Sequence, residues 1–93
     1  MKTKVDIAKL EKISRALGDP YRVKMLDTIR HKPEGVTCYA MKEMFDLAQS
    51  TVSHHLKQLV DADLLLYEKN GRCSRYWINK KTLSDFVNLL KKI

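Results

Sequence analysis

The dipeptide Asn70-Gly71 is the feature that most limits how this chain can fold, because it joins two short extended segments. These segments run over residues 64–69 and 72–78. Asn and Gly both tolerate the positive φ angles of a type I′ turn, so the pair is typical of a tight antiparallel hairpin. The sequence therefore predicts one small β-hairpin in the C-terminal half of the chain.

On both sides of this hairpin in the sequence, apolar residues recur at the spacing of a helix. The first helix is expected to stop at Gly18, and Asp19-Pro20 restarts a second one, with Asp as N-cap and Pro in the first turn. A third helix starts near Thr37, and a fourth covers roughly 50 to 62. Capping-box patterns at 3–6 and 82–85 mark the starts of the first and last helices.

The expected order is four helices, two strands and a last helix, so the fold class is mainly α with a small β-hairpin. A wide apolar arc predicts that the second helix is the most buried, through Val23, Met25, Leu26 and Ile29. The third helix presents Cys38, Met41, Met44 and Phe45 on one side. Two short helices followed directly by a hairpin describe a winged helix-turn-helix.

Length and charge narrow the choice of function. A chain of 93 residues supports one hydrophobic core, so we expect a single domain over residues 1–93. It carries 18 Lys and Arg against 11 Asp and Glu, a net charge of +7. The positive electrostatic field of such a chain favours nucleic acid as a partner first and an anionic membrane surface second. A basic protein without an anionic partner can have the same excess of positive charge.

The sequence does not suggest a membrane or secreted protein. Its longest apolar run, 64–67, is far shorter than the roughly 20 residues of a membrane-spanning helix, and no apolar segment follows the basic start. Two cysteines, Cys38 and Cys73, do not make a disulfide framework. We expect a cytoplasmic protein with no membrane partner.

The fourth helical segment, AQSTVSHHLKQL at 48–59, has a polar start and an apolar stripe. At about 100° per residue, the stripe contains Val52, Leu56, Leu59 and Val60. The opposite face carries Ser50, His54, Lys57 and Asp61. His55 borders the stripe, so we expect it to pack and to bond to backbone or a neighbouring helix, whereas His54 points outward.

Short hydrogen-bonding side chains at a helix N-terminus suit phosphate oxygens and base edges. We therefore expect double-stranded DNA as the partner of this helix. The predicted contacts are Gln49, Ser50, Thr51, Ser53, His54 and Lys57. Other roles stay open, since Ser50 can be the N-cap and His54 and Lys57 can be solvated surface residues.

The hairpin supplies a second set of candidate contacts, a basic tip formed by Lys69, Asn70, Gly71, Arg72 and Arg75. Its position after the polar helix favours a wing over the phosphate backbone or the minor groove, with Arg72 as the leading candidate. The alternative is an edge hairpin kept soluble by its charge. Tyr76, Trp77 and Ile78 are expected to pack on the body of the domain.

The residues from about 16 to 78 resemble the ArsR/SmtB family of bacterial winged-helix repressors. ALGDPYRVKMLDTI at 16–29 is similar to that family's second-helix signature. LAQSTVSHHLKQLVDADLL at 47–65 is similar to its recognition helix, and NGRCSRYWI at 70–78 to its wing. Asp63 departs from the glycine that is usual in the family, and Asp tolerates a left-handed conformation better than most residues.

This resemblance implies a repressor that binds an inverted-repeat operator as a homodimer, with half-sites about one helical turn apart. It places the family's DNA contacts on Gln49, Ser50, Ser53 and His54, with a wing contact near Arg72. The first and last helices would form the subunit interface. The interface residues expected there are Ile7, Leu10, Leu83, Phe86, Val87 and Leu90.

Many members of this family release DNA when a metal binds, but the usual ligands are not matched here. Thr37 and Tyr39 stand where the family has a Cys-x-Cys pair, and the last helix contains no histidine. We therefore expect no sensing metal and no cofactor, and the effector is left open. Arg22 is expected to be a buried ion-pair residue rather than a DNA contact.

Three other functions are alternatives to a DNA-binding repressor. A thiol-based redox switch would use Cys73, which lies near Arg72 and Arg75, or Cys38, for which core packing is the alternative. A winged helix can also serve as a protein-interaction module. An enzyme is not expected, because Ser53 and His54 lack an orienting carboxylate and no phosphate loop or acid pair is present.

Overall fold

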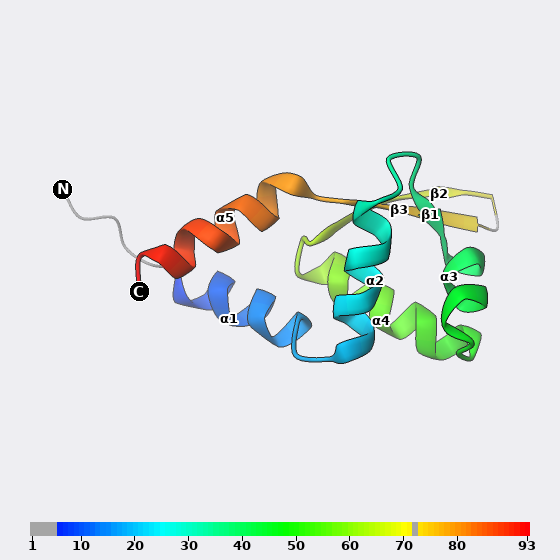
Figure 1. Cartoon of the computed structure of the whole chain (residues 1–93), viewed down its shortest axis with the longest axis horizontal. Coiled ribbons are helices and arrows are strands. Elements are labelled where there is room, and N and C mark those ends of the chain that lie inside the picture. The colour runs from blue at the N-terminus through cyan, green and yellow to red at the C-terminus, as the bar shows by residue number, and fades with distance from the viewer. Residues whose placement is uncertain (1–5, 72) are drawn as a thin grey trace.

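The computed structural model describes residues 6–71 and 73–93, which form five helices and three strands (Figure 1). The order is α1 (Ile7–Ala16), α2 (Pro20–Arg30), β1 (Val36–Thr37), α3 (Cys38–Phe45), α4 (Gln49–Asp61), β2 (Leu65–Asn70), β3 (Cys73–Ile78) and α5 (Lys80–Lys91). The predicted order of helices and hairpin is confirmed, with β1 as an addition that the sequence did not suggest.

Side-chain caps explain where four of the helices begin. The Asp19 carboxylate accepts from the amides of Tyr21 and Arg22 at the start of α2, and Thr37 caps α3. Asp6 is itself the N-cap of α1, whereas residue 3 of the expected capping box lies outside the described residues. The expected start at 82–85 was wrong, because Asn79 caps α5 and Thr82 lies within its first turn.

The sheet is antiparallel with the strand order β1-β3-β2, so the hairpin gains a short third strand on its β3 edge. Val36 pairs with Tyr76, and Asn70 pairs with Cys73. Asn70, which was predicted to lie in the turn, is therefore the last residue of β2. Gly71 has a φ of 66°, a left-handed conformation that glycine adopts without a steric penalty.

The hydrophobic core lies where α2, α3 and α4 meet the sheet and the end of α1. Its most completely buried side chains are Ile13, Met25, Ile29, Met41, Val52, Leu56, Leu59 and Leu64. Two expectations about the core were wrong, since Val23 is 46% exposed and Met44 is 50% exposed. Apolar character alone did not tell which edge of each helix is covered by a neighbour.

Asp63 links α4 to β2 in the left-handed conformation, with a φ of 61°. The position at which the family usually has glycine therefore does need a positive φ, and Asp accepts that conformation at some steric cost. This turn reverses the chain so that the hairpin lies beside α4.

Helices α1 and α5 lie side by side at one end of the molecule, and the turn of the hairpin lies at the other (Figure 1). Lys9 on α1 and Asp85 on α5 form a salt bridge of 3.3 Å. Of the six residues expected at a subunit interface, Ile7, Val87 and Leu90 are exposed, whereas Leu10, Leu83 and Phe86 are half-buried. None of the helices in the described residues is both long and apolar enough to cross a membrane.

Candidate nucleic-acid interface

Helix α4 separates its side chains into two faces. The inner face, defined by Val52, His55, Leu56 and Leu59, is buried in the core. The outer face, defined by Ser50, His54, Lys57 and Asp61, is exposed to solvent. Gln49, Thr51 and Ser53 are exposed as well, so all six residues of α4 that were predicted to contact DNA are accessible.

The start of α4 has no side-chain cap. Ala48 is the N-cap residue and makes no capping side-chain bond, so the interpretation of Ser50 as the N-cap was wrong. The first amides of a helix lack intrahelical partners, and they attract anions when no side chain satisfies them. The exposed hydroxyls of Ser50 and Thr51 lie in this same turn, where they are accessible to an anionic ligand.

Gln49 and Ser53 both approach the thiol of Cys38, the first residue of α3. The Gln49 Nε2 group donates to the Cys38 Sγ at 3.1 Å, and the Ser53 Oγ lies 3.8 Å from the same sulfur. Cys38 is half-buried and packs against the core, so it is only partly the core residue that was expected. These contacts position Gln49 and Ser53 on the side of α4 that faces α3.

Lys57 forms an ion pair one turn further along the outer face. Its Nζ group donates to the Asp61 Oδ2 atom at 2.9 Å. This hydrogen bond, together with the negative charge of Asp61, raises the pKa of the exposed Lys57 above its usual value. The cation that was predicted to contact DNA is therefore already paired with a carboxylate in the free protein.

His55 is held in the core by Arg22, a residue of α2. The Arg22 Nη1 group lies 3.3 Å from His55 Nδ1. Because a guanidinium group only donates, Nδ1 is the acceptor and the ring proton lies on Nε2. The Tyr21 ring stacks on the imidazole with ring centroids 6.0 Å apart. The prediction that His55 packs and bonds to a neighbouring helix is confirmed.

Arg22 does not have the expected role of a buried ion-pair residue. It is half-buried, and its Nε group donates to the Ala16 carbonyl at 2.6 Å. Its Nη2 group also donates to the Arg15 carbonyl at 3.4 Å. Arg22 therefore joins the C-terminal end of α1 to α4. It supplies a donor to the Ala16 carbonyl at the end of the helix and a second donor to the Arg15 carbonyl, which also accepts from the Gly18 amide.

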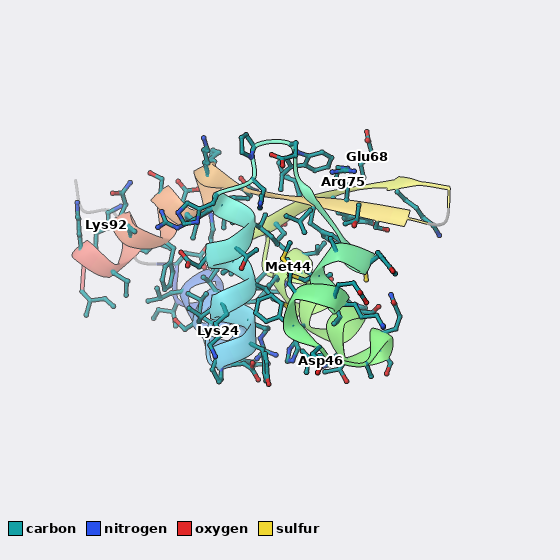
Figure 2. All side chains as sticks on the ribbon, turned by 45° about the vertical axis from the view of Figure 1, so that its right-hand side comes forward. Lys24, Met44, Asp46, Glu68, Arg75 and Lys92 are labelled. Carbon is teal, nitrogen blue, oxygen red and sulfur yellow. The ribbon has the colours of Figure 1, made fainter. Side chains whose placement is uncertain are left out.

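The hairpin residues with predicted DNA contacts differ in position. Lys69 is exposed on β2 near the turn, and Arg72 lies outside the described residues. Arg75 is not part of the tip, because its Nη1 group donates to the carbonyls of Glu34 and Gly35 at 3.2 and 3.3 Å. Figure 2 shows Arg75 on the side of the hairpin turned away from α3 and α4.

The loop that binds Arg75 is also closed by a tryptophan. Gly35 has a φ of 85°, and a Cβ atom placed there would lie 2.7 Å from the Trp77 ring and 2.8 Å from the Arg75 side chain. Trp77 and Ile78 are half-buried, as is Tyr76. The expectation that residues 76–78 pack on the body of the domain is confirmed for Tyr76 and Ile78, which pack against the core. Trp77 instead packs with Arg75 against the loop at Gly35.

An open groove of about 250 Å³ separates α4 from the hairpin. It is lined by Ser53, Lys57, Val60, Asp61, Tyr67 and Tyr76. The two tyrosines are paired across the strands and stack with ring centroids 6.0 Å apart. They were not predicted as site residues, although the alternation of side chains along a strand places 67 and 69 on one face of the hairpin.

Burial, followed by the charge of the nearby Cys38, raises the pKa of Tyr76 above its usual value, and a hydrogen bond with Ser74 opposes this rise. The hydroxyl of Tyr76 is therefore neutral near pH 7 and can donate a hydrogen bond to an anion. Together with the hydroxyls and the lysine of α4, this surface offers donors suited to phosphate oxygens.

Within the described residues, no group of three or more His, Cys, Asp or Glu side chains could hold a metal ion. His31, which lies far from His54 and His55 in the sequence, uses its Nδ1 atom in a contact of 2.8 Å with the Asp27 carbonyl. The side chain of Cys73 lies outside what the structure describes.

Sequence comparison relates the chain to known regulators. The model of a helix-turn-helix domain family matches residues 17–68, more than half of the chain. The arsenical resistance operon repressor of Staphylococcus xylosus is 38% identical over 80 residues, which cover 85% of this chain and 73% of the relative. The transcriptional repressor SdpR of Bacillus subtilis is 29% identical over 79 residues, covering 85% and 86%.

The fold also matches a solved structure. An ArsR-like transcriptional regulator from Rhodococcus sp. RHA1 superposes with a TM-score of 0.81 at 21% identity, covering 92% of this chain and 79% of the other. This likeness confirms the winged-helix fold.

Proposed function

The chain belongs to the ArsR family of winged helix-turn-helix transcriptional regulators, and we propose that it represses transcription as a homodimer bound to an inverted-repeat operator. It is a DNA-binding transcriptional regulator. In the proposal, one domain over residues 1–93 supplies both the DNA-binding surface and the subunit interface. The family consists of regulators rather than enzymes, which confirms the prediction that the chain is not an enzyme.

The single observation that carries the proposed mode of binding is the outer face of α4. Its side chains are exposed, and the inner face anchors the helix in the core. A helix held in this way fits the major groove, where exposed side chains of its first turns can meet both base edges and phosphates. Base contacts are assigned to Gln49, Ser50 and His54, and phosphate contacts to Thr51, Ser53 and Lys57.

The hairpin is the proposed wing. Lys69 is exposed close to the turn and is assigned a phosphate contact, and Arg72 keeps its sequence-based assignment. Arg75 is withdrawn from the contacts, because its guanidinium group is bonded to the carbonyls of Glu34 and Gly35. The wing then contributes fewer cations than the sequence suggested.

Helices α1 and α5 are the proposed subunit interface. Ile7 is 73% exposed, and Val87 and Leu90 are also exposed, beside half-buried Leu10, Leu83 and Phe86. Exposed apolar side chains gathered on two adjacent helices indicate a surface that is covered in an assembly. Two α4 helices related by a two-fold axis would then reach half-sites about 34–36 Å apart.

We further propose that the protein acts in the cytoplasm without a sensing metal. The name of the Staphylococcus xylosus relative refers to arsenical resistance, but the present chain has only two cysteines, Cys38 and Cys73. Thr37 and Tyr39 stand at the positions of the family's Cys-x-Cys pair.

Selection from a random pool of double-stranded DNA tests this function directly. We expect an enriched inverted repeat, bound with an affinity that falls steeply with salt, since each neutralised phosphate contributes about 0.9 to the log–log slope. Ser53→Ala and His54→Ala should weaken binding without changing the circular dichroism spectrum. The absence of any enriched site would contradict the proposal and favour a protein-interaction module.

The homodimer is tested by sedimentation equilibrium on the wild type and on Leu90→Asp. A carboxylate buried in an apolar interface loses its hydration, so we expect the variant to dissociate into monomers. The control is Asn88→Asp, which adds the same charge to an exposed polar position of α5. A wild type that sediments as a monomer at micromolar concentration would contradict the dimer.

A further inference from the structure

In the proposed mode of binding, the groove between α4 and the hairpin lies on the path of one backbone strand of the DNA duplex. If α4 occupies the major groove and the hairpin approaches the adjacent minor groove, one sugar–phosphate strand must pass between them, because a single backbone separates the two grooves. The space available for that strand is the groove of about 250 Å³ lined by side chains of both elements.

Tyr67 and Tyr76 form the hairpin side of this groove. Their rings stack on one another, and Tyr67 is exposed whereas Tyr76 is half-buried. Phenolic hydroxyls can donate to phosphate oxygens, and the ring faces provide a firm apolar surface for a deoxyribose. Stacked rings with polar ends are therefore suited to the alternation of sugar and phosphate along a strand.

Lys57 and Asp61 form the α4 side. The placement of this pair is poor for helix stability, because Asp61 is the last residue of α4, where the helix dipole disfavours a negative charge. The order of the pair, with the cation N-terminal to the acid, is also the less stabilising one. A contribution to helix stability is thus a weak explanation for a carboxylate at this position.

We propose that the groove holds the backbone strand between the two DNA grooves, and that Asp61 limits DNA affinity by holding Lys57 in an ion pair. In the free protein the Lys57 Nζ group donates to Asp61 at 2.9 Å. When phosphate enters the groove, Lys57 exchanges one anion for another, and the carboxylate repels the phosphate at short range. The inference rests on the proposed DNA-binding function, because it assigns a further part of the same surface.

The test uses Asp61→Asn in the full chain and compares its dissociation constants with those of the wild type on the selected operator and on an unrelated duplex. Both duplexes have the same backbone, and a contact with phosphate does not depend on base sequence. We therefore expect the DNA affinity to rise by about 3- to 10-fold on each duplex. Release of Lys57 should also make the salt slope steeper by roughly 0.9.

Glu68→Gln is the matched control, because it removes one negative charge from the other face of the same hairpin. Figure 2 shows Glu68 pointing away from α3 and α4. Because successive side chains of a strand point to opposite faces, Glu68 lies on the face of the hairpin opposite Tyr67. Charge interactions weaken with distance and are screened by salt, so the gain in affinity should be clearly smaller than the gain for Asp61→Asn. Equal gains for Asp61→Asn and Glu68→Gln would overturn the inference.

Further variants test whether Lys57 is the partner of Asp61 and whether the two tyrosines form the second side of the groove. In a Lys57→Ala background, Asp61→Asn should gain clearly less affinity than in the wild type, because no lysine is released. Equal gains in both backgrounds would overturn the role of Lys57. Tyr67→Phe and Tyr76→Phe should each weaken both duplexes to a similar degree, and unchanged affinity in both would overturn their contact with the strand.

The outcomes separate this inference from the proposed function. A wild type that binds no duplex contradicts both. A wild type that binds, and that is weakened by His54→Ala while Asp61→Asn behaves like Glu68→Gln, leaves the DNA-binding function in place and removes only the assignment of the groove. Circular dichroism of each variant checks that the fold is kept.

Discussion

The inner and outer faces of α4 arise from the same 13 residues but have opposite surroundings. His55 accepts from Arg22 and stacks on Tyr21 in the core, whereas His54, its neighbour, is exposed. The difference follows from the 100° rotation between successive helical residues. Residue type therefore says little about the role of a histidine here, and position around the helix axis says most.

The largest expected difference between the faces concerns stability. Leu56→Ala should lower the free energy of unfolding by about 2–5 kcal/mol, because it removes a fully buried side chain and leaves a cavity. Leu66→Ala is the matched control, since Leu66 is 54% exposed on β2, and its effect should stay within about 1 kcal/mol. Urea denaturation at one fixed protein concentration measures both. Similar losses for the two leucines would contradict the assignment of the inner face.

The adjacent histidines give the next test. His55→Ala should lower the free energy of unfolding by about 1–3 kcal/mol, because the Arg22 Nη1 group loses its acceptor in a half-buried position. His54→Ala should change it by less than about 0.5 kcal/mol. The same urea titrations provide the measurement. If His54→Ala were the more destabilising variant, the proposed division of α4 would be reversed.

A smaller effect is expected where α4 turns into the hairpin. Asp63→Gly should raise the free energy of unfolding by up to about 1 kcal/mol, because glycine accepts the φ of 61° without a Cβ clash and the loss in chain entropy offsets only part of this gain. Thermal unfolding would detect the shift, and Asp63→Val should move it in the opposite direction. A lower stability for Asp63→Gly would show that the carboxylate makes a stabilising contact.

Local patterns predicted much of this fold. The apolar spacing of 50–62 and the Asp19-Pro20 start are short-range signals, and the structure has helices at Gln49–Asp61 and Pro20–Arg30. The separation of His54 from His55 followed from the same periodicity. These features depend on residues within one or two helical turns, which is why sequence alone was sufficient.

Several of the errors concern contacts between distant segments. The strand Val36–Thr37 exists because it pairs with β3, about 40 residues away, and its two residues carry no periodic signal. Arg75 was counted among the tip cations, but a loop far away in sequence supplies carbonyl acceptors for it. Arg22 likewise bonds to carbonyls of α1, where charge alone suggested an ion pair.

The candidate site divides in the same way. The polar residues of α4 were predicted as contacts from one helix, whereas the proposed role of Tyr67 and Tyr76 was not predicted, because it depends on the hairpin lying against α4. Alternation along β2 gave a partial signal, since it places Tyr67 and Lys69 on one face. The buried Leu65 lies on this same face, so this is the face of the hairpin that turns toward α4.

The central claim is that the outer face of α4 reads base pairs, and the most direct measurement is the affinity for every single base-pair variant of the selected operator. For the wild type we expect each mismatch at a contacted position to cost about 1–3 kcal/mol. His54→Ala should abolish the preference at one or two positions of each half-site and leave the others unchanged. A profile of preferences identical in His54→Ala and wild type would contradict base reading by this residue.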